Sequence, residues 1–221
     1  MYQSLIYKEW IKTRKVITLM AIIFAGMWIY SFLKINEAGR LMGMVSYWET
    51  LIQKGIVFFT AFRFIPLSLG ILLAITQYVP ELQSKRLKLT LHLPLPEKRI
   101  IAIMLLYGLI ITLLFITIVM ALLLWGLSAD FPPEIVGGTF QLLLPWFLAA
   151  PAAYLIASWT CLEPLWKQRI LNGIVGIAAL SFFFIDAKAG ACTTLNLWLA
   201  ALTAVAFLFP FYSTMRFKEG K

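Results

Sequence analysis

The chain has few of the residues on which most enzymatic chemistry depends. Its 221 residues include one histidine, His92, two cysteines and 10 acids. A single imidazole without neighbouring Cys or carboxylate ligands makes a poor metal site. The sequence also lacks G-x-x-x-x-G-K-[ST], H-E-x-x-H and G-x-S-x-G, the motifs of phosphate-binding loops, zinc peptidases and serine hydrolases. We therefore expect no catalytic residue, no metal site and no cofactor site in this chain.

Hydrophobic residues, in contrast, are abundant. They make up 62% of the sequence, and the mean hydropathy is +0.88, whereas a soluble domain is about 45–50% apolar. The formal net charge of +9 would suggest a nucleic-acid partner in a soluble protein. In a membrane protein it matches the excess of Lys and Arg on the cytoplasmic side. We predict a single, all-α integral membrane domain over 1–221, with no nucleic-acid partner.

The apolar runs predict six transmembrane helices, because a span needs about 20 mostly apolar residues. The expected spans are 16–33, 55–78, 100–127, 138–159, 170–186 and 195–212.

The distribution of cations predicts the orientation of these spans. With the N-terminus inside, the inner segments hold fourteen of the nineteen cations and the outer segments hold four, while the acids divide five and five. This bias follows the positive-inside rule. We expect both termini in the cytoplasm and the chain in the bacterial cytoplasmic (inner) membrane.

The first fifteen residues predict a separate amphipathic helix. Tyr2, Leu5, Ile6 and Trp10 recur at helical spacing, and Lys8, Lys12 and Lys15 recur on another face. This pattern fits a helix in the inner headgroup plane with its cations toward anionic lipid. A solvated basic tail is the alternative.

Two features inside the predicted spans are candidates for function. Arg63 is a formal charge well inside a span, which suggests a substrate path or an interface pair with an acid such as Glu49, although a long side chain can also reach the headgroups. Ala149, Ala153 and Ala157 repeat at the small-xxx-small spacing that allows close helix packing. Their spacing is compatible with packing inside the chain and with an interface to a second subunit.

The segment 79–99 between spans two and three differs from a simple connection. It carries Lys85, Arg86, Lys88, Lys98 and Arg99, with leucines at every second position from 87 to 95. Pro80 suits the first position of a helix and Glu81 its first turn, so we predict a short helix that ends before Pro94. The apolar set favours docking to another protein, and electrostatic attachment to anionic lipid is the alternative.

These residues resemble the permease subunits of type-2 ATP-binding cassette (ABC) transporters. Members carry a cytoplasmic coupling helix between spans two and three, which begins at an acid and ends at Pro-Leu before a basic residue; Glu81, Pro94-Leu95 and Lys98 match this pattern. Tyr7-Lys8-Glu9-Trp10 is similar to the family's amphipathic N-terminal helix. The resemblance covers the whole topology.

The resemblance implies a non-catalytic permease half that pairs with a second copy or a paralogue. A cytoplasmic ABC ATPase subunit would hold ATP and Mg and receive the coupling helix. The implied docking residues are Glu81, Lys85, Arg86, Leu87, Lys88, Leu89, Leu91 and His92. The leucines would anchor the helix, and the cations would steer it onto an acidic rim.

Two other functions remain open at this point. One is a stand-alone membrane enzyme that acts on lipid, for which the sequence offers Arg63 and scattered hydroxyls. The other is an ion-coupled carrier, which ordinarily places acids at mid-membrane. The acid closest to the core of a predicted span is Asp186, at an end.

Overall fold

The computed structural model is all-helical over the residues that it describes, which are 2–42, 62–83, 96–185 and 193–219. The helices are α1 (Tyr2–Met42), α3 (Ile65–Gln83), α5 (Glu97–Ser128), α6 (Pro133–Leu162), α7 (Trp166–Ser181), α8 (Thr193–Ala206) and α9 (Phe209–Glu219), with the 3₁₀ turn η2 (Phe182–Phe184) after α7.

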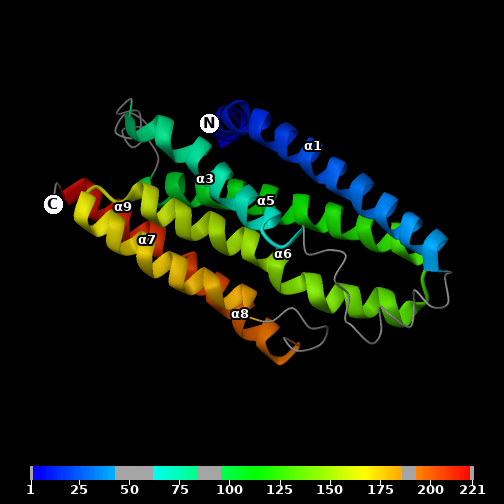
Figure 1. Cartoon of the computed structure of the whole chain (residues 1–221). Helices are drawn as coiled ribbons and strands as arrows, with labels where there is room; N and C mark the ends of the chain where they lie inside the picture. Colours follow the sequence, from blue (N-terminus) through cyan, green and yellow to red (C-terminus); the bar gives the residue numbers. More distant parts are fainter. Residues whose placement is uncertain (1, 43–61, 84–95, 186–192, 220–221) are drawn as a thin grey trace.

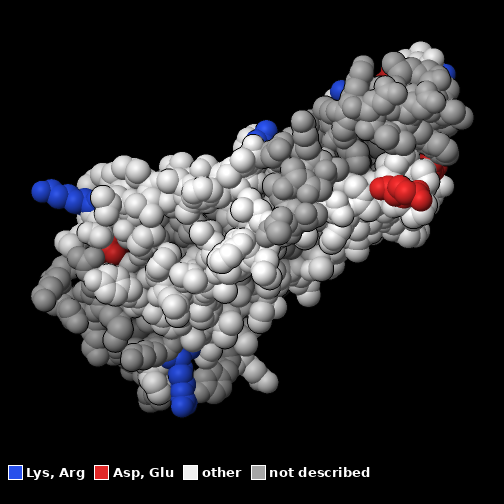
Figure 2. Space-filling model, turned by 90° about the horizontal axis from the view of Figure 1, so that it is seen from below, with Lys and Arg blue, Asp and Glu red and all other residues white. Residues whose placement is uncertain are grey.

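Several of these helices are long and apolar enough to cross a membrane. By length and composition they are Gln3–Leu41, Ile65–Leu82, Arg99–Ser128 and Pro133–Leu162; the stretch Leu195–Thr214, which runs from α8 into α9, is long and apolar enough as well. The helix at the predicted fifth span, α7, has 16 residues and continues into η2. Much of the described surface seen in Figure 2 is free of charged atoms, as expected for helices that face hydrocarbon.

Helix α6 is the central element of the bundle. It packs against α3, α5, α7, α8 and α9, while α1 lies along α3 and α5. The middle turns of α6 are buried on several sides. Trp146 and Tyr154, which lie in these turns, are fully buried. Close packing with α3 depends on Gly70, since a Cβ there would lie 2.1 Å from the carbonyl oxygen of Ala150. Glycine at this position lets the two backbones approach.

The two chain termini lie at the same end of the bundle (Figure 1). The C-terminal ends of α3 and α6 and the N-terminal ends of α5 and α7 are at this end too. We call it the terminal end, and the opposite one the far end. The terminal end corresponds to the side that the cation distribution predicts to be cytoplasmic.

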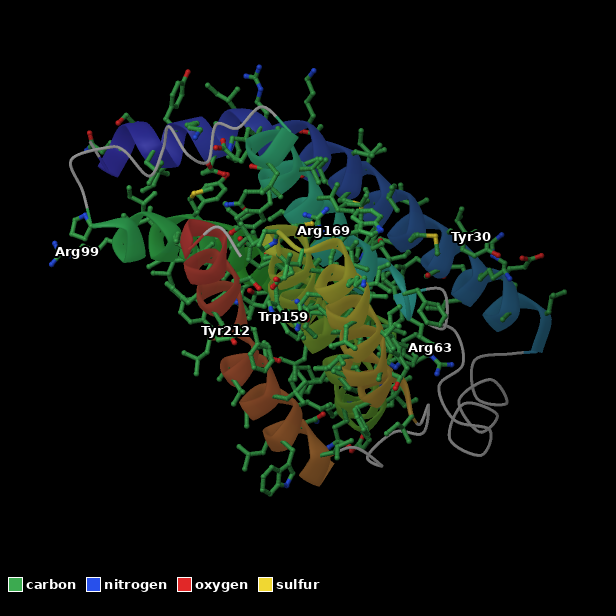
Figure 3. All side chains as sticks on the ribbon, turned by 90° about the vertical axis from the view of Figure 1, so that its left-hand side faces the viewer. Tyr30, Arg63, Arg99, Trp159, Arg169 and Tyr212 are labelled. Atoms are coloured by element: carbon green, nitrogen blue, oxygen red, sulfur yellow. The ribbon has the colours of Figure 1, made fainter. Side chains whose placement is uncertain are left out.

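The N-terminal segment is not the separate element that we predicted. Residues 2–42 form one uninterrupted helix, because no glycine or proline occurs before Gly26 to break it. Helix α1 bends, so that its first part runs at an angle to the remainder (Figures 1 and 3).

The prediction that Pro80 starts a new helix is also wrong. Helix α3 continues through Pro80 to Gln83. Proline removes one backbone hydrogen bond, but membrane helices tolerate this where packing supports the last turn. Here Tyr78 and Glu81 are both buried in that turn.

The predicted sixth span consists of two helices. α8 and α9 are separated by a turn at 207–208, in which Phe207 and Leu208 donate to carbonyls three residues earlier. Pro210 is the second residue of α9, and a proline cannot donate the hydrogen bond that a continuous helix would require.

Candidate functional site

Of the predicted docking residues, one lies in the part of the chain that the structure describes, and the others lie outside it. Lys85, Arg86, Leu87, Lys88, Leu89, Leu91 and His92 lie outside the described residues. Glu81 lies within them, at the end of α3 and just before this segment. The site is therefore built from Glu81 and the residues that surround it at the terminal end.

Glu81 is buried against α1 and forms ion pairs with it. Its side chain is 1% exposed, and its Oε1 lies 2.8 Å from Nζ of Lys8 and 2.7 Å from Nζ of Lys12. Both lysines are on the first turns of α1, so the end of α3 is held to the N-terminal helix. Our prediction that these cations face anionic lipid is wrong for Lys12, which is 15% exposed and points into the protein.

Lys12 is shared between two carboxylates. Its Nζ also lies 2.7 Å from Oε1 of Glu9, one turn earlier on α1, and donates to the carbonyl oxygen of Gln77 at 3.5 Å. Glu9 is fully buried, and its Oε2 has no hydrogen-bond partner. Buried charges require partners because desolvation is costly. Glu9 therefore depends on Lys12, whereas Glu81 is held by both Lys12 and Lys8. We call Lys8, Glu9, Lys12 and Glu81 the Glu81 cluster.

A second layer of hydrogen bonds connects α3 with α5 and α6. The amide of Gln77 donates to the carbonyl oxygen of Met104 at 2.8 Å and accepts from the hydroxyl of Tyr154 at 2.9 Å. The hydroxyl groups of Tyr154 and Tyr78 lie 3.2 Å apart. All of these side-chain groups are buried, so each depends on its partner for hydrogen bonding.

The N-terminal helix is also tied to α5. The hydroxyls of Thr13 and Tyr107 lie 2.8 Å apart, and both residues are buried. Together with the Glu81 cluster, this contact fixes the start of α1 to the two helices that flank segment 84–95. These contacts join α1, α3 and α5 on both sides of that segment.

A separate cluster of polar side chains joins α6, α7 and α9 at the terminal end. Glu163 is fully buried and accepts a hydrogen bond from Ser213 at 2.6 Å. Arg169 donates to the backbone carbonyl of Glu163 at 2.8 Å and lies 5.5 Å from the ring of Trp166. Arg169 is near the middle of the bundle when the molecule is viewed from this end (Figure 3). These contacts fix the position where α6 ends and α7 begins.

The prediction that Arg63 lies inside a helical span is wrong. Arg63 precedes α3 in a bend, and its Nη2 donates to the carbonyl oxygen of Phe184 at 2.5 Å. The rings of Phe64, Trp146 and Phe184 lie 5.5–5.9 Å from its guanidinium carbon. Arg63 therefore joins the start of α3 to the end of η2; the suggested partner Glu49 lies outside the described residues.

The alanine repeat of α6 packs inside the chain. Ala149 and Ala153 have no exposed surface and belong to one hydrophobic core cluster, against which the half-buried Ala157 also packs. Since the chain's own helices cover the first two residues, internal packing is the interpretation that holds for them.

The sequence analysis did not find the polar partners of Glu81. Lys12 and Glu9 were visible as an i, i+3 pair of opposite charge, and Gln77 as a polar residue inside an apolar run. These signals mark candidates, but they do not reveal which helix faces them. Among the described residues, no group of three or more His, Cys, Asp or Glu could hold a metal ion.

Comparison of the chain with protein-family models, with curated proteins and with solved structures found no match. The functional argument therefore depends on the residues and geometry described above.

Proposed function

We propose that the chain is the permease subunit of an ATP-driven transporter of the type-2 ABC class. A separate cytoplasmic ATPase subunit binds ATP and Mg and docks on the coupling segment 79–99. The permease pairs with a second copy or a paralogue in the bacterial cytoplasmic membrane, with both termini in the cytoplasm. Movement of the coupling segment drives substrate export or conformational work.

The observation that carries this proposal is the position of Glu81. Glu81 is the last ionisable residue that the structure describes before the basic, leucine-rich segment, and it is buried. Its carboxylate is held by Lys8 and Lys12 of α1. A loop that only connected two spans would not need a buried ionic attachment at its base. An attachment of this kind supports a role in transmitting force.

The proposed mechanism is a linkage between two conformations. ATP binding can change the permease only through contacts that differ in free energy between its two states. A docked segment that moves with the ATPase displaces the end of α3 and the start of α5. The Glu81 cluster and the Thr13–Tyr107 contact carry this displacement to α1.

The position of the buried acids does not favour an ion-coupled carrier. The buried acids among the described residues are Glu9, Glu81 and Glu163. They lie in the first turns of α1, near the end of α3 and directly after α6, all at the terminal end. A carrier ordinarily needs titratable groups near the middle of the membrane. No arrangement described here favours the lipid-processing enzyme.

The proposal is tested by charge reversal of Lys85, Arg86 and Lys88 to Glu in the full-length chain. We expect this variant to lose a nucleotide-binding ATPase that copurifies with the wild-type chain from its native membrane, because complementary charge steers and orients docking. A matched control reverses Arg14, Lys15 and Lys167, which are exposed at the same end of the bundle.

The control carries the same change in net charge, so it separates docking from nonspecific electrostatics. Both variants should remain monodisperse and helical by circular dichroism. Retention of the ATPase by the Lys85/Arg86/Lys88 variant, or equal loss in both variants, would contradict the proposal.

A further inference from the structure

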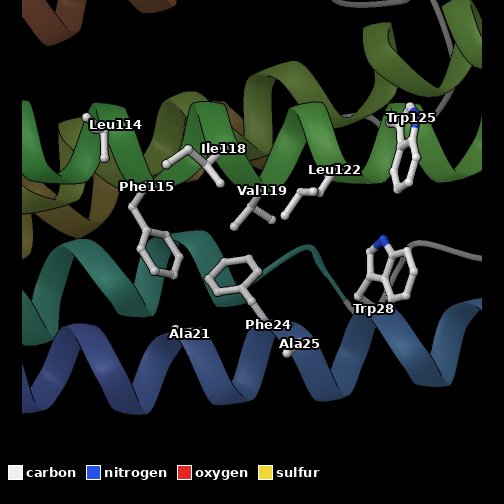
Figure 4. Close-up of a pocket in the computed structure, with 10 residues that line it drawn as sticks. All are labelled: Ala21, Phe24, Ala25, Trp28, Leu114, Phe115, Ile118, Val119, Leu122 and Trp125. Carbon is white, nitrogen blue, oxygen red and sulfur yellow. The ribbon is translucent and has the colours of Figure 1, made fainter.

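Two pockets of the described bundle differ in the chemistry of their walls. The groove between α1 and α5 encloses about 430 Å³ and has an almost entirely apolar lining (Figure 4). A smaller pocket of about 180 Å³ at the terminal end is lined by a cation, Arg169 of α7, together with Val79 and Leu82 of α3 and Thr160 and Cys161 of α6. A cation in the wall selects an anionic ligand. We call this smaller pocket the Arg169 pocket.

The guanidinium of Arg169 is held in place without being neutralised. Its Nη2 donates to the carbonyl oxygens of Cys161 at 3.3 Å and Glu163 at 2.8 Å, and its carbon lies 5.5 Å from the ring of Trp166. Nη1 keeps accessible surface and has no hydrogen-bond or ion-pair partner among the described residues. A donor that is already oriented binds a ligand with little further loss of entropy.

The neighbouring parts of the chain do not supply an anion to this pocket. The described lining residues include no acid. The carboxylate of Glu163 is buried elsewhere and accepts a hydrogen bond from Ser213. Residues 84–95, which follow α3 directly, contain three cations and no acid. An anion for the Arg169 pocket is therefore expected from another molecule.

Arg169 lies where the exposed side of α7 changes from polar to apolar. Trp166 and Lys167, at the start of α7, are exposed. The exposed residues between 170 and 178 are all apolar: Ile170, Leu171, Ile174, Val175, Ile177 and Ala178. Tryptophan favours the membrane–water interface, and a continuous apolar surface on a membrane helix faces hydrocarbon. The guanidinium of Arg169 therefore lies at the depth of the lipid headgroups.

Lipid phosphate is the anion that a membrane offers at this depth. Guanidinium groups bind phosphate through charge-assisted hydrogen bonds, and basic pockets between helices on the cytoplasmic side bind anionic headgroups. The exposed Lys167 adds a second positive charge close to Arg169, which favours a headgroup with net negative charge over a zwitterionic one.

We propose that the Arg169 pocket binds the phosphate of an anionic glycerophospholipid, with Nη1 of Arg169 as the donor and the acyl chains along the exposed apolar side of α7. The site requires the terminal end to lie at the membrane surface. It does not require an ATPase partner, so it stands or fails independently of the proposed function.

The test uses the full-length chain in detergent, titrated with phosphatidylglycerol or with phosphatidylcholine that carries the same acyl chains. Native mass spectrometry counts the lipids that remain bound. The wild type should retain the first phosphatidylglycerol about fivefold better than phosphatidylcholine, which is the effect of one basic residue near anionic lipid. Arg169→Gln should remove this preference.

Val79→Phe fills the pocket and keeps Arg169, so it should also remove the preference, and it tests the site if Arg169→Gln does not fold. Arg14→Gln is the matched control, because Arg14 is exposed on α1 at the same end and does not line the pocket. It should leave the preference unchanged. A preference that survives both pocket variants, or an equal loss in Arg14→Gln, would overturn the proposal.

Two soluble competitors identify the source of the phosphate. Inorganic phosphate and glycerophosphoglycerol, which is the headgroup without its acyl chains, should not displace phosphatidylglycerol at equal concentration, because the chains add apolar contact with α7. Displacement by either compound would assign the pocket to a soluble phosphate and overturn the lipid proposal. Loss of a copurifying ATPase in Arg169→Gln, with an unchanged lipid preference, would overturn it in favour of a protein partner.

Discussion

The most informative perturbation of the terminal end is the substitution Lys12→Met. Nζ of Lys12 lies 2.7 Å from Glu9 and 2.7 Å from Glu81, and both carboxylates are at most 1% exposed. Methionine keeps most of the side-chain volume and removes the charge. It leaves Glu9 without the cation that contacts its carboxylate, while Glu81 still has Lys8.

The expected loss of stability follows from this geometry. Removing one partner of a buried ion pair costs about 3–5 kcal/mol, because the remaining charge is buried without compensation. Lys8→Met should cost about 1 kcal/mol or less, since Lys8 is 35% exposed and its pair with Glu81 is partly screened by solvent. The structure therefore predicts that Lys12 contributes several times more than Lys8, although both contact the same oxygen.

The assay is thermal unfolding in detergent, followed by the helical signal in circular dichroism. A loss of 3–5 kcal/mol corresponds to a decrease in Tm of roughly 6–20 °C for a chain of this size. The charge-free combination Glu9→Gln/Lys12→Met/Glu81→Gln should recover at least half of that decrease, because no buried charge is left unpaired. Equal, small shifts for Lys8→Met and Lys12→Met would refute the reasoning.

Two further substitutions test the packing around α6. Gly70→Ala should destabilise the protein by about 1–3 kcal/mol or prevent folding, since the added Cβ would lie 2.1 Å from the carbonyl oxygen of Ala150. Gly137→Ala, which meets no atom within 4 Å, should instead be neutral or raise Tm slightly. Tyr154→Phe should cost about 1–3 kcal/mol in the same unfolding assay, because it removes the hydroxyl that donates to the buried Oε1 of Gln77.

The positions of the helices could be predicted where the apolar runs were long and uninterrupted. Spans 100–127 and 138–159 fall inside α5 and α6. The errors occurred where local signals competed with packing. Pro80 is a typical helix start in sequence, but the buried neighbours of α3 hold the helix through it. Arg63 lay in a hydrophobic run, and only the structure places it in a bend before α3.

The partners of the candidate site could not be predicted, because they depend on which helices are neighbours. The sequence identified Glu81 but assigned it to the first turn of a docking helix rather than to an ionic contact with α1. Lys8 and Lys12 were expected to face lipid, although i, i+3 spacing with Glu9 allows Lys12 to turn inward. Tyr154 lies 77 residues from Gln77 in the sequence, and no local pattern connects them.

The central claim is that the segment after Glu81 is held by a separate ATPase. The most direct measurement is crosslinking in native membranes from a photoactivatable amino acid introduced at Leu89, followed by identification of the product. The account predicts a crosslink to a nucleotide-binding ATPase subunit, whereas crosslinks to lipid alone would contradict it.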